Sequence, residues 1–183
     1  MSVPSRRVLC PLAPGFEEIE ALAPVDLLRR AGAEVVVAAL LDETWVTGRS
    51  GVAVRADTVL ANASERGFDA LVIPGGPGTK AIRADGRVRD LARAFAAAGK
   101  PIAAICAAPT VLRDAGLLEG KRFTAHHSVY DELPNAIAEE RVVEDGLLIT
   151  SRGAGTAVDF GLAIVRRLYG KDVCDEVARA IMA

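Results

Sequence analysis

The sequence contains few cysteines, and their spacing excludes two common classes of small protein. Cys10, Cys106 and Cys174 are odd in number, lie far apart and form no Cys-x-x-Cys pair. A disulfide framework and a structural zinc site both need paired or clustered cysteines. We therefore expect three free thiols and no bound metal.

Long apolar runs and an excess of positive charge are also absent. No run approaches the roughly 20 apolar residues of a membrane-spanning helix, and the first apolar stretch is too short for the core of a signal peptide. The net charge is −2, the isoelectric point is near 5.8, and Lys and Arg are scattered along the chain. Charge gives no reason to expect nucleic-acid binding. We expect a soluble, cytoplasmic protein that does not bind membranes.

Nucleotide-binding motifs are missing as well. The segment Pro74-Gly75-Gly76-Pro77-Gly78 breaks the Gly-x-Gly-x-x-Gly spacing, and no Gly-Lys-Ser/Thr phosphate loop occurs. We expect no nucleotide and no other cofactor.

The sequence does contain an alternation of short apolar, β-branched runs with Ala-, Leu- and Arg-rich stretches of helical period. This alternation predicts an α/β protein, a doubly wound and mainly parallel sheet with helices on both faces, and the length favours one domain over residues 1–183. The segment Thr44 to Ala56 interrupts the alternation and predicts a small β excursion at the sheet edge. The expected strands are Arg7 to Leu12, Glu34 to Leu40, Ala70 to Ile73, Ile102 to Ala104, and Leu147 to Thr150 in a hairpin with Val142 to Glu144. The expected helices are Glu17 to Ala31, Thr79 to Ala84, Arg87 to Ala98, Pro109 to Ala115, Thr156 to Tyr169 and Lys171 to Met182.

Cys106 is the leading candidate for a functional residue. It ends the apolar run Ile-Ala-Ala-Ile, and Pro109 follows where a helix can begin. Ligands of open α/β sheets bind at the carboxyl ends of the strands, and a helix N-terminus favours a thiolate over a thiol. The pattern predicts a nucleophile at a strand-to-helix turn.

A thiol needs a partner, and Glu20 is the first candidate. If Glu20 approaches the sulfur, two anions compete for one site, and we expect the remaining proton on the carboxyl group. The alternative is that Glu17, Glu18 and Glu20 form a solvated first helical turn that the helix dipole favours.

Further candidates surround this pair. His126 and His127 are the only histidines, and one of them could orient the thiolate or carry protons, whereas a surface pair without chemistry is an equal alternative. The backbone N–H groups of Gly75, Gly76 and Ala107 could donate to an oxyanion. The alternative for the two glycines is a tight strand-to-helix turn.

Four motifs in this order resemble the ThiJ/PfpI superfamily, in particular the branch of the parkinsonism-associated protein deglycase and its bacterial relatives. They are Gly-Phe-Glu-Glu-Ile-Glu, Val-Ile-Pro-Gly-Gly, Ala-Ala-Ile-Cys-Ala-Ala-Pro-Thr and Thr-Ser-Arg-Gly-Ala-Gly-Thr, and the resemblance covers nearly the whole chain. It implies a flavodoxin-like fold, a homodimer and a reactive cysteine on a strained elbow.

By position, the resemblance also implies roles for individual residues. Cys106 matches the nucleophile, Glu20 its carboxyl partner and His126 the nearby histidine. Gly75, Gly76 and Ala107 match the oxyanion donors. Arg49 and Arg152 match arginines of an anion-accepting pocket, and Arg29 or Arg30, with Arg30 preferred, approaches from the second subunit.

The function that the resemblance implies is a cofactor-free glyoxalase or deglycase. Its substrates are small 2-oxoaldehydes such as methylglyoxal, or their adducts with amines and thiols, and its products are 2-hydroxy acids. The alternative is a redox sensor or holdase chaperone that uses the same oxidisable cysteine. An isonitrile hydratase fits less well. A peptidase is disfavoured, because Ala107 stands where the protease-like branch has a histidine.

Overall fold

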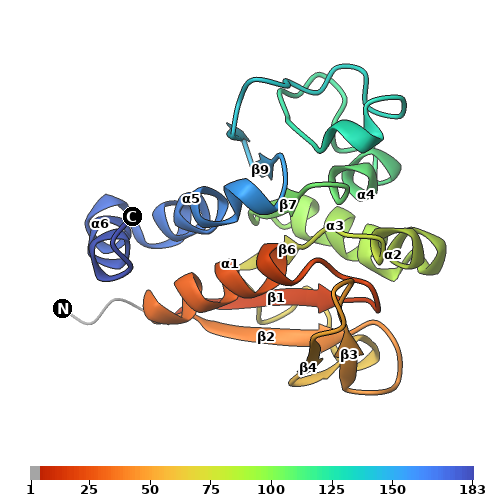
Figure 1. Cartoon of the computed structure of the whole chain (residues 1–183), viewed down its shortest axis with the longest axis horizontal. Helices are drawn as coiled ribbons and strands as arrows, with labels where there is room; N and C mark the ends of the chain where they lie inside the picture. The colour runs from red at the N-terminus through yellow and green to blue at the C-terminus, as the bar shows by residue number, and fades with distance from the viewer. Residues whose placement is uncertain (1–4) are drawn as a thin grey trace.

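The computed structural model describes residues 5–183, and a seven-stranded sheet forms its centre (Figure 1). The strand order is β5-β2-β1-β6-β7-β9-β8. All neighbouring strands run parallel except β8 and β9, which form an antiparallel hairpin. The strands of this sheet are β1 (Arg7–Leu12), β2 (Glu34–Ala39), β5 (Thr58–Val59), β6 (Ala70–Ile73), β7 (Ile102–Ile105), β8 (Val142–Asp145) and β9 (Leu148–Ser151).

The predicted mainly parallel sheet is confirmed, and strand ends differ from the prediction by one residue at several places. Ile105 still pairs with Ser151, so β7 extends up to Cys106. The sequence analysis missed β5, which has two residues and pairs with the end of β2. So short a strand shows no alternating pattern that could have predicted it.

Helices cover both faces of the sheet, as the alternation predicts. On one face, Leu28 of α1, Phe160 of α5 and Val177 of α6 belong to the same apolar core as Val8 of β1. On the other face, Phe95 of α3 packs in the core that contains Leu9. Figure 1 shows α5 and α6, in blue, on the side of α1, and α2 to α4 in green. The α-helices are α1 (Glu18–Arg30), α2 (Thr79–Asp85), α3 (Arg87–Ala97), α4 (Pro109–Asp114), α5 (Ala157–Tyr169) and α6 (Lys171–Ala180), and the 3-10 turns are Leu60–Asn62, His127–Val129 and Ala154–Thr156.

The predicted β excursion is a separate two-stranded sheet. Its strands, β3 (Trp45–Thr47) and β4 (Ala53–Arg55), pair antiparallel. The turn between them is fixed to the start of α1, because Oε1 of Glu18 accepts the Ser50 backbone N–H at 2.7 Å. The hairpin is thereby held beside the residues that follow β1.

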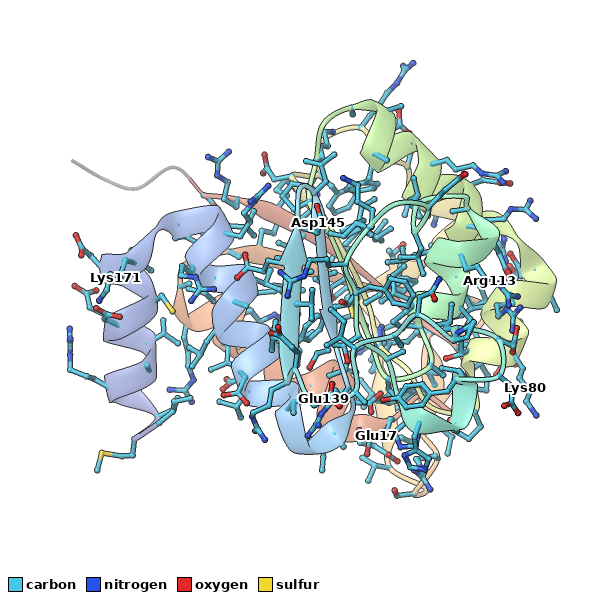
Figure 2. All side chains as sticks on the ribbon, turned by 90° about the horizontal axis from the view of Figure 1, so that it is seen from above. Glu17, Lys80, Arg113, Glu139, Asp145 and Lys171 are labelled. Carbon is cyan, nitrogen blue, oxygen red and sulfur yellow. The ribbon has the colours of Figure 1, made fainter. Side chains whose placement is uncertain are left out.

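Most charged side chains lie on the outside of the molecule. Lys171 on α6 and Lys80 on α2 project at opposite ends (Figure 2). Within residues 5–183, none of the helices combines the length and the apolar character that crossing a lipid bilayer requires.

Candidate active site

Cys106 lies where the carboxyl ends of the parallel strands meet, in a pocket of about 520 Å³. Segments from six parts of the chain line this pocket, and the predicted residues Glu20, Gly76, Ala107 and His126 are among them. We call it the Cys106 pocket. The fold therefore brings together residues that lie more than a hundred positions apart in the sequence.

The backbone of Cys106 adopts a strained conformation. Its φ angle is 65°, in the left-handed region, and the only other non-glycine residue between 5 and 183 with positive φ is Met182 near the chain end. Two hydrogen bonds hold the strained residue: its N–H donates to Ser151 at 2.9 Å, and its carbonyl accepts the His126 N–H at 2.9 Å. Such conformations persist where the surrounding structure fixes them, often at functional sites. The elbow implied by the family resemblance is present.

Glu20 reaches the sulfur from the first turn of α1. Its side chain is 1% exposed and hydrogen-bonded to the Cys106 thiol. Oε2 of Glu20 accepts the Gly75 backbone N–H at 3.1 Å. Glu17 caps the helix, because its Oε2 accepts the Glu20 N–H at 2.8 Å. The carboxyl group of Glu20 is thus fixed next to the nucleophile.

None of the three glutamates faces water, so the alternative of a solvated helical turn is wrong. Glu17 and Glu18 are each 8% exposed. Glu17 caps the helix and lines the Cys106 pocket, and Glu18 binds the β3–β4 turn. The sequence pattern could not show this, because the partners of Glu18 and Glu20 come from other segments.

The pKa values of Cys106 and Glu20 are both raised. Burial raises the pKa of Glu20 to about 7, and the neighbouring Glu17 carboxyl adds to this shift. Burial raises the pKa of Cys106 to about 12, and the Glu20 carboxylate contributes to the increase. Each anion disfavours ionisation of the other, so the pair keeps at least one proton near neutral pH and carries at most one negative charge.

This result differs from the expectation of a thiolate created by the helix N-terminus. The helix after Cys106, α4, has only 6 residues and begins three positions later, so burial outweighs its dipole. The Glu20 carboxyl group beside the sulfur is the group that can exchange a proton with it.

Two backbone N–H groups interact with the Cys106 sulfur, and two others interact with the Glu20 carboxyl group. Those of Gly76 and Ala107 lower the pKa of Cys106 by interacting with its sulfur, and those of Gly75 and Ala154 act in the same way on Glu20. Gly76 and Ala107 therefore lie where the predicted oxyanion donors should be. Gly75 does not, because its N–H already donates to the Glu20 carboxyl.

The two glycines also allow a close approach of chain segments. A Cβ on Gly75 would lie 2.6 Å from both the Cys106 Cβ and the Glu20 Oε2. Gly76 has φ +89°, and a Cβ there would lie 2.5 Å from the Glu17 backbone nitrogen. The alternative of an ordinary tight turn does not explain these contacts.

Replacing Gly76 by Ala is expected to destabilise the protein, because the new methyl group meets backbone atoms that cannot move aside. A matched control is Gly116→Ala, where φ is +76° and a Cβ would meet no atom within 4 Å. The control should cost about 1 kcal/mol from backbone strain, and Gly76→Ala about 2 kcal/mol more from the clash. Urea denaturation measures both, and equal losses would contradict the argument.

His126 is the histidine that belongs to the Cys106 pocket, whereas His127 is exposed and lines only a neighbouring pocket. The Ser128 N–H donates to Nδ1 of His126 at 3.2 Å, so the neutral ring carries its hydrogen on Nε2. Burial lowers the pKa of His126, as do His127 and Arg49. The ring is a neutral donor near pH 7, which fits orientation better than proton storage.

The three predicted arginines, Arg49, Arg152 and Arg30, lie in three different parts of the structure. Arg49 lines the Cys106 pocket. Arg152 lines the neighbouring pocket instead, and its Nη1 donates to the carbonyl of Ala138 at 2.7 Å. Arg30 lies at the far end of α1 from Glu20 and pairs with Asp26 at 2.7 Å.

Several pocket residues were not predicted from the sequence. Thr79, Lys80, Thr110 and Ser128 line the Cys106 pocket, and Ala154 interacts with Glu20 through its N–H. They lie in α2, in α4 and in two 3-10 turns, and only the packing of these elements brings them to the pocket. Within residues 5–183, no group of three or more His, Cys, Asp or Glu side chains is arranged to hold a metal ion.

The raised pKa of Glu20 predicts a pH-dependent loss of stability. Because the folded pKa of about 7 exceeds the ordinary glutamate value of 4.5, the native state binds a proton that the unfolded chain releases between these two pH values. The contribution of Glu20 to the free energy of unfolding is fully present below pH 4.5. It falls by about 3 kcal/mol as the pH rises to about 7.

Glu20→Gln should lack this loss, because the amide does not titrate and still accepts the Gly75 N–H. The measurement is urea denaturation of both proteins between pH 4.5 and 8, with the difference between them plotted against pH. Parallel curves would show that Glu20 titrates normally in the folded protein.

Known proteins are similar to this chain over nearly its whole length. The model of the DJ-1/PfpI family matches residues 6–167. Protein dj-1beta of Drosophila melanogaster is 43% identical over 182 residues, covering 97% of each chain. The Danio rerio Parkinson disease protein 7 homolog is 36% identical and covers 94% of each. The crystal structure of Drosophila DJ-1beta superposes with a TM-score of 0.94 over 98% of this chain and 99% of its own.

Proposed function

The chain belongs to the DJ-1/PfpI family, and on that premise we propose that it is a cofactor-free, cysteine-dependent glyoxalase or deglycase. Its substrates are small 2-oxoaldehydes such as methylglyoxal, or their adducts with amines and thiols, and its products are 2-hydroxy acids. The observation that carries the proposal is the hydrogen-bonded pair of Cys106 and Glu20 on the strained elbow. This pair supplies a nucleophile and a proton acceptor at one place.

The first step is addition of the Cys106 sulfur to the aldehyde carbon of methylglyoxal. The new C–S bond forms as the aldehyde C=O becomes C–O, and the thiol proton passes through Glu20 to that oxygen. The product is a hemithioacetal. Gly76 and Ala107 present N–H groups near the sulfur, where they can stabilise the developing oxyanion.

The second step is a proton shift between the two carbons. Glu20, now a carboxylate, removes the hydrogen from the carbon bonded to sulfur and returns it to the neighbouring ketone carbon. The hydroxyl proton of the first carbon passes to the oxygen of the second, so that the first carbon becomes a thioester carbonyl and the second becomes a carbinol. A pKa near 7 suits a group that both accepts and donates a proton near neutral pH.

The third step is hydrolysis. Water adds to the thioester carbonyl, the C–S bond breaks, and the sulfur recovers its proton. Lactic acid is released, so the net reaction is methylglyoxal plus water giving lactic acid. An amine adduct enters the same sequence as an aminocarbinol and releases its amine.

We also propose a cytoplasmic homodimer in which Arg30 of one subunit approaches the site of the other. In the single chain Arg30 is remote from Cys106. Ile19 and Leu22 on the same helix are 54% and 38% exposed, which favours a partner for this face. Sedimentation equilibrium of the purified protein measures the oligomeric state.

The test of the function is lactate formation from methylglyoxal by purified protein in the absence of glutathione. We expect turnover that saturates with substrate and needs no added metal or nucleotide. A rate equal to that of buffer would contradict the proposal.

A redox sensor is the second candidate, because the structure of oxidized DJ-1 from Toxoplasma gondii, 37% identical to this chain, has been solved. The same sulfur could react with a peroxide. Glu20→Gln separates the candidates: lactate formation should vanish if the protein is a glyoxalase, whereas peroxide oxidation of Cys106 and protection of client proteins could persist in a sensor.

A further inference from the structure

Four charged side chains form a closed network of ion pairs beside the Cys106 pocket. Arg83 of α2 donates Nε and Nη2 to Asp114 of α4 at 2.7 and 3.2 Å. It also donates Nη1 and Nη2 to Glu132 at 3.1 and 3.0 Å. Arg113 pairs with the same two carboxylates, with Asp114 at 3.0 Å and with Glu132 at 2.8 Å. We call these four residues the Arg83 network.

The geometry of the network suits it to hold chain segments in place rather than to bind a ligand. Two guanidinium groups and two carboxylates leave no net charge. Arg83 lines the Cys106 pocket, but four of its five N–H groups already bond to carboxylate oxygens. Isolated ion pairs in water stabilise little, whereas bidentate pairs joined in a network fix the orientation of their groups.

The network is also partly shielded from water. The side chains of Arg83 and Asp114 are 26% and 27% exposed. Burial opposes the ionisation of Asp114, but hydrogen bonds from Arg83 and Arg113 outweigh this effect and lower its pKa. The carboxylate therefore keeps its charge near neutral pH, and the network stays complete.

Two members of the network lie on helices that begin at the oxyanion donors. The carbonyl of Gly76 accepts the N–H of Thr79, the first residue of α2, at 3.1 Å. The carbonyl of Ala107 accepts the N–H and the hydroxyl of Thr110, in the first turn of α4, at 3.1 and 2.6 Å. Because α2 has seven residues and α4 has six, the network lies within about two helical turns of both donors.

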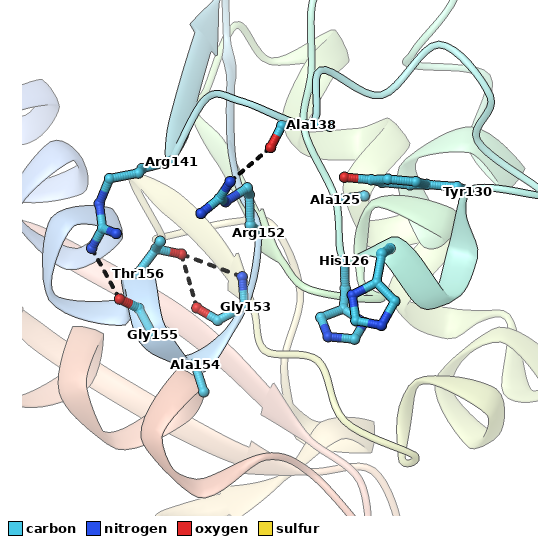
Figure 3. Close-up of a pocket in the computed structure, with 11 residues that line it drawn as sticks. Ala125, His126, Tyr130, Ala138, Arg141, Arg152, Gly153, Ala154, Gly155 and Thr156 are labelled. Carbon is cyan, nitrogen blue, oxygen red and sulfur yellow. Dashed lines mark hydrogen bonds between the residues drawn. The ribbon is translucent and has the colours of Figure 1, made fainter.

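The third segment carries His126. The 3-10 turn His127–Val129 lies between His126 and Tyr130 (Figure 3). The Val129 N–H donates to the carbonyl of His126 at 3.1 Å, and the Glu132 N–H donates to the carbonyl of Val129 at 3.0 Å. Two consecutive turns thus connect the histidine to the network.

We propose that Asp114 is a positioning residue for the reaction, and that it acts through the Arg83 network. The network sets the distances among the two oxyanion donors and the ring of His126. Among the residues that the structure describes, those lining the Cys106 pocket include Arg83 and Glu132 but not Asp114. The effect on turnover rests on the proposed function. A misplacement of about 1 Å can cost about 10²-fold in rate.

Asp114→Ala tests the proposal, and Asp85→Ala is the matched control. Each aspartate is the last residue of its helix, and their side chains are 27% and 21% exposed. Asp85 also accepts two hydrogen bonds from one arginine, from Nε and Nη2 of Arg87 at 2.7 and 2.8 Å. Arg87 begins α3 and lines a different pocket. The control therefore loses a similar ion pair that does not connect to the site.

We expect Asp114→Ala to lower kcat for lactate formation by about tenfold or more, with little change in KM. Asp85→Ala should lower kcat by less than about twofold. Asp114→Asn keeps one oxygen that can accept from Arg83, so it should lose less than the alanine variant. It also provides the test if Asp114→Ala does not fold.

Alkylation by iodoacetamide, followed at each cysteine by mass spectrometry, reports on the site without turnover. Burial raises the pKa of the Cys106 thiol, and the N–H groups of Gly76 and Ala107 partly offset this increase. Displacing these groups in Asp114→Ala should therefore slow the alkylation of Cys106 by about threefold or more at a fixed pH. Cys10 is fully buried and should stay unreactive. A general loosening of the fold would instead speed alkylation at both cysteines.

Two results would overturn the inference. One is equal kcat for Asp114→Ala and Asp85→Ala when the unchanged protein forms lactate. The other is an alkylation rate of Cys106 that stays unchanged in Asp114→Ala, or that rises together with the rate of Cys10. Failure of the proposed function is a separate result: if the unchanged protein forms no lactate and Asp114→Ala still slows the alkylation of Cys106, only the proposed function is rejected.

Discussion

Cys106→Ser is expected to lower kcat/KM for lactate formation from methylglyoxal by about 10³-fold or more. A serine hydroxyl is far less acidic than a thiol, so Glu20 cannot ionise it even at hydrogen-bond distance. The thioester that follows the proton shift cannot form either, because it requires sulfur. The loss should therefore appear mainly in kcat. Measurement needs only purified protein, methylglyoxal and an assay for lactate.

The chain provides a matched control for this substitution. Cys174 is half-buried on α6, and its Sγ donates to the carbonyl of Leu162 at 3.3 Å, a hydrogen bond that serine can replace. Cys174→Ser should keep full activity. Equal activity of Cys106→Ser and the unchanged protein would exclude covalent catalysis by this sulfur.

Glu20→Gln is expected to lower kcat by about 10²–10⁴-fold with little change in KM. The amide has nearly the shape of the carboxyl group and can still accept the Gly75 N–H, so the pocket should keep its form. It cannot accept the thiol proton or remove hydrogen from carbon. Both chemical steps should therefore slow, while substrate binding continues.

Glu17→Gln is the control for Glu20. Glu17 lies three residues earlier, lines the same pocket and caps α1 through one oxygen, which glutamine also has. We expect the kcat of Glu17→Gln to fall by less than about tenfold, because the substitution changes the charge near Glu20 and removes no reacting group. A loss as large as that of Glu20→Gln would show that the negative charge of the first turn, and no single carboxylate, supports the reaction.

The order of elements and the identity of the nucleophile could be predicted from the sequence. Short β-branched runs between helical stretches predicted the sheet and its helices, and Cys106 was found because it ends such a run. These features depend on neighbours in the sequence: strand and helix periods, turn residues and a motif of eight residues. Local patterns of this kind are visible without knowing which segments pack together.

The tertiary structure alone decided how the predicted groups act. It directs the Gly75 N–H to Glu20, places Arg152 in a second pocket and buries Glu18 under the β3–β4 turn. It also raises the pKa of Cys106, against the direction that the strand-to-helix turn predicted. Each of these outcomes depends on burial and on distances between segments far apart in the chain. Desolvation and the interaction of two buried anions grow steeply as groups leave water and approach each other, and no spacing along the sequence encodes that approach.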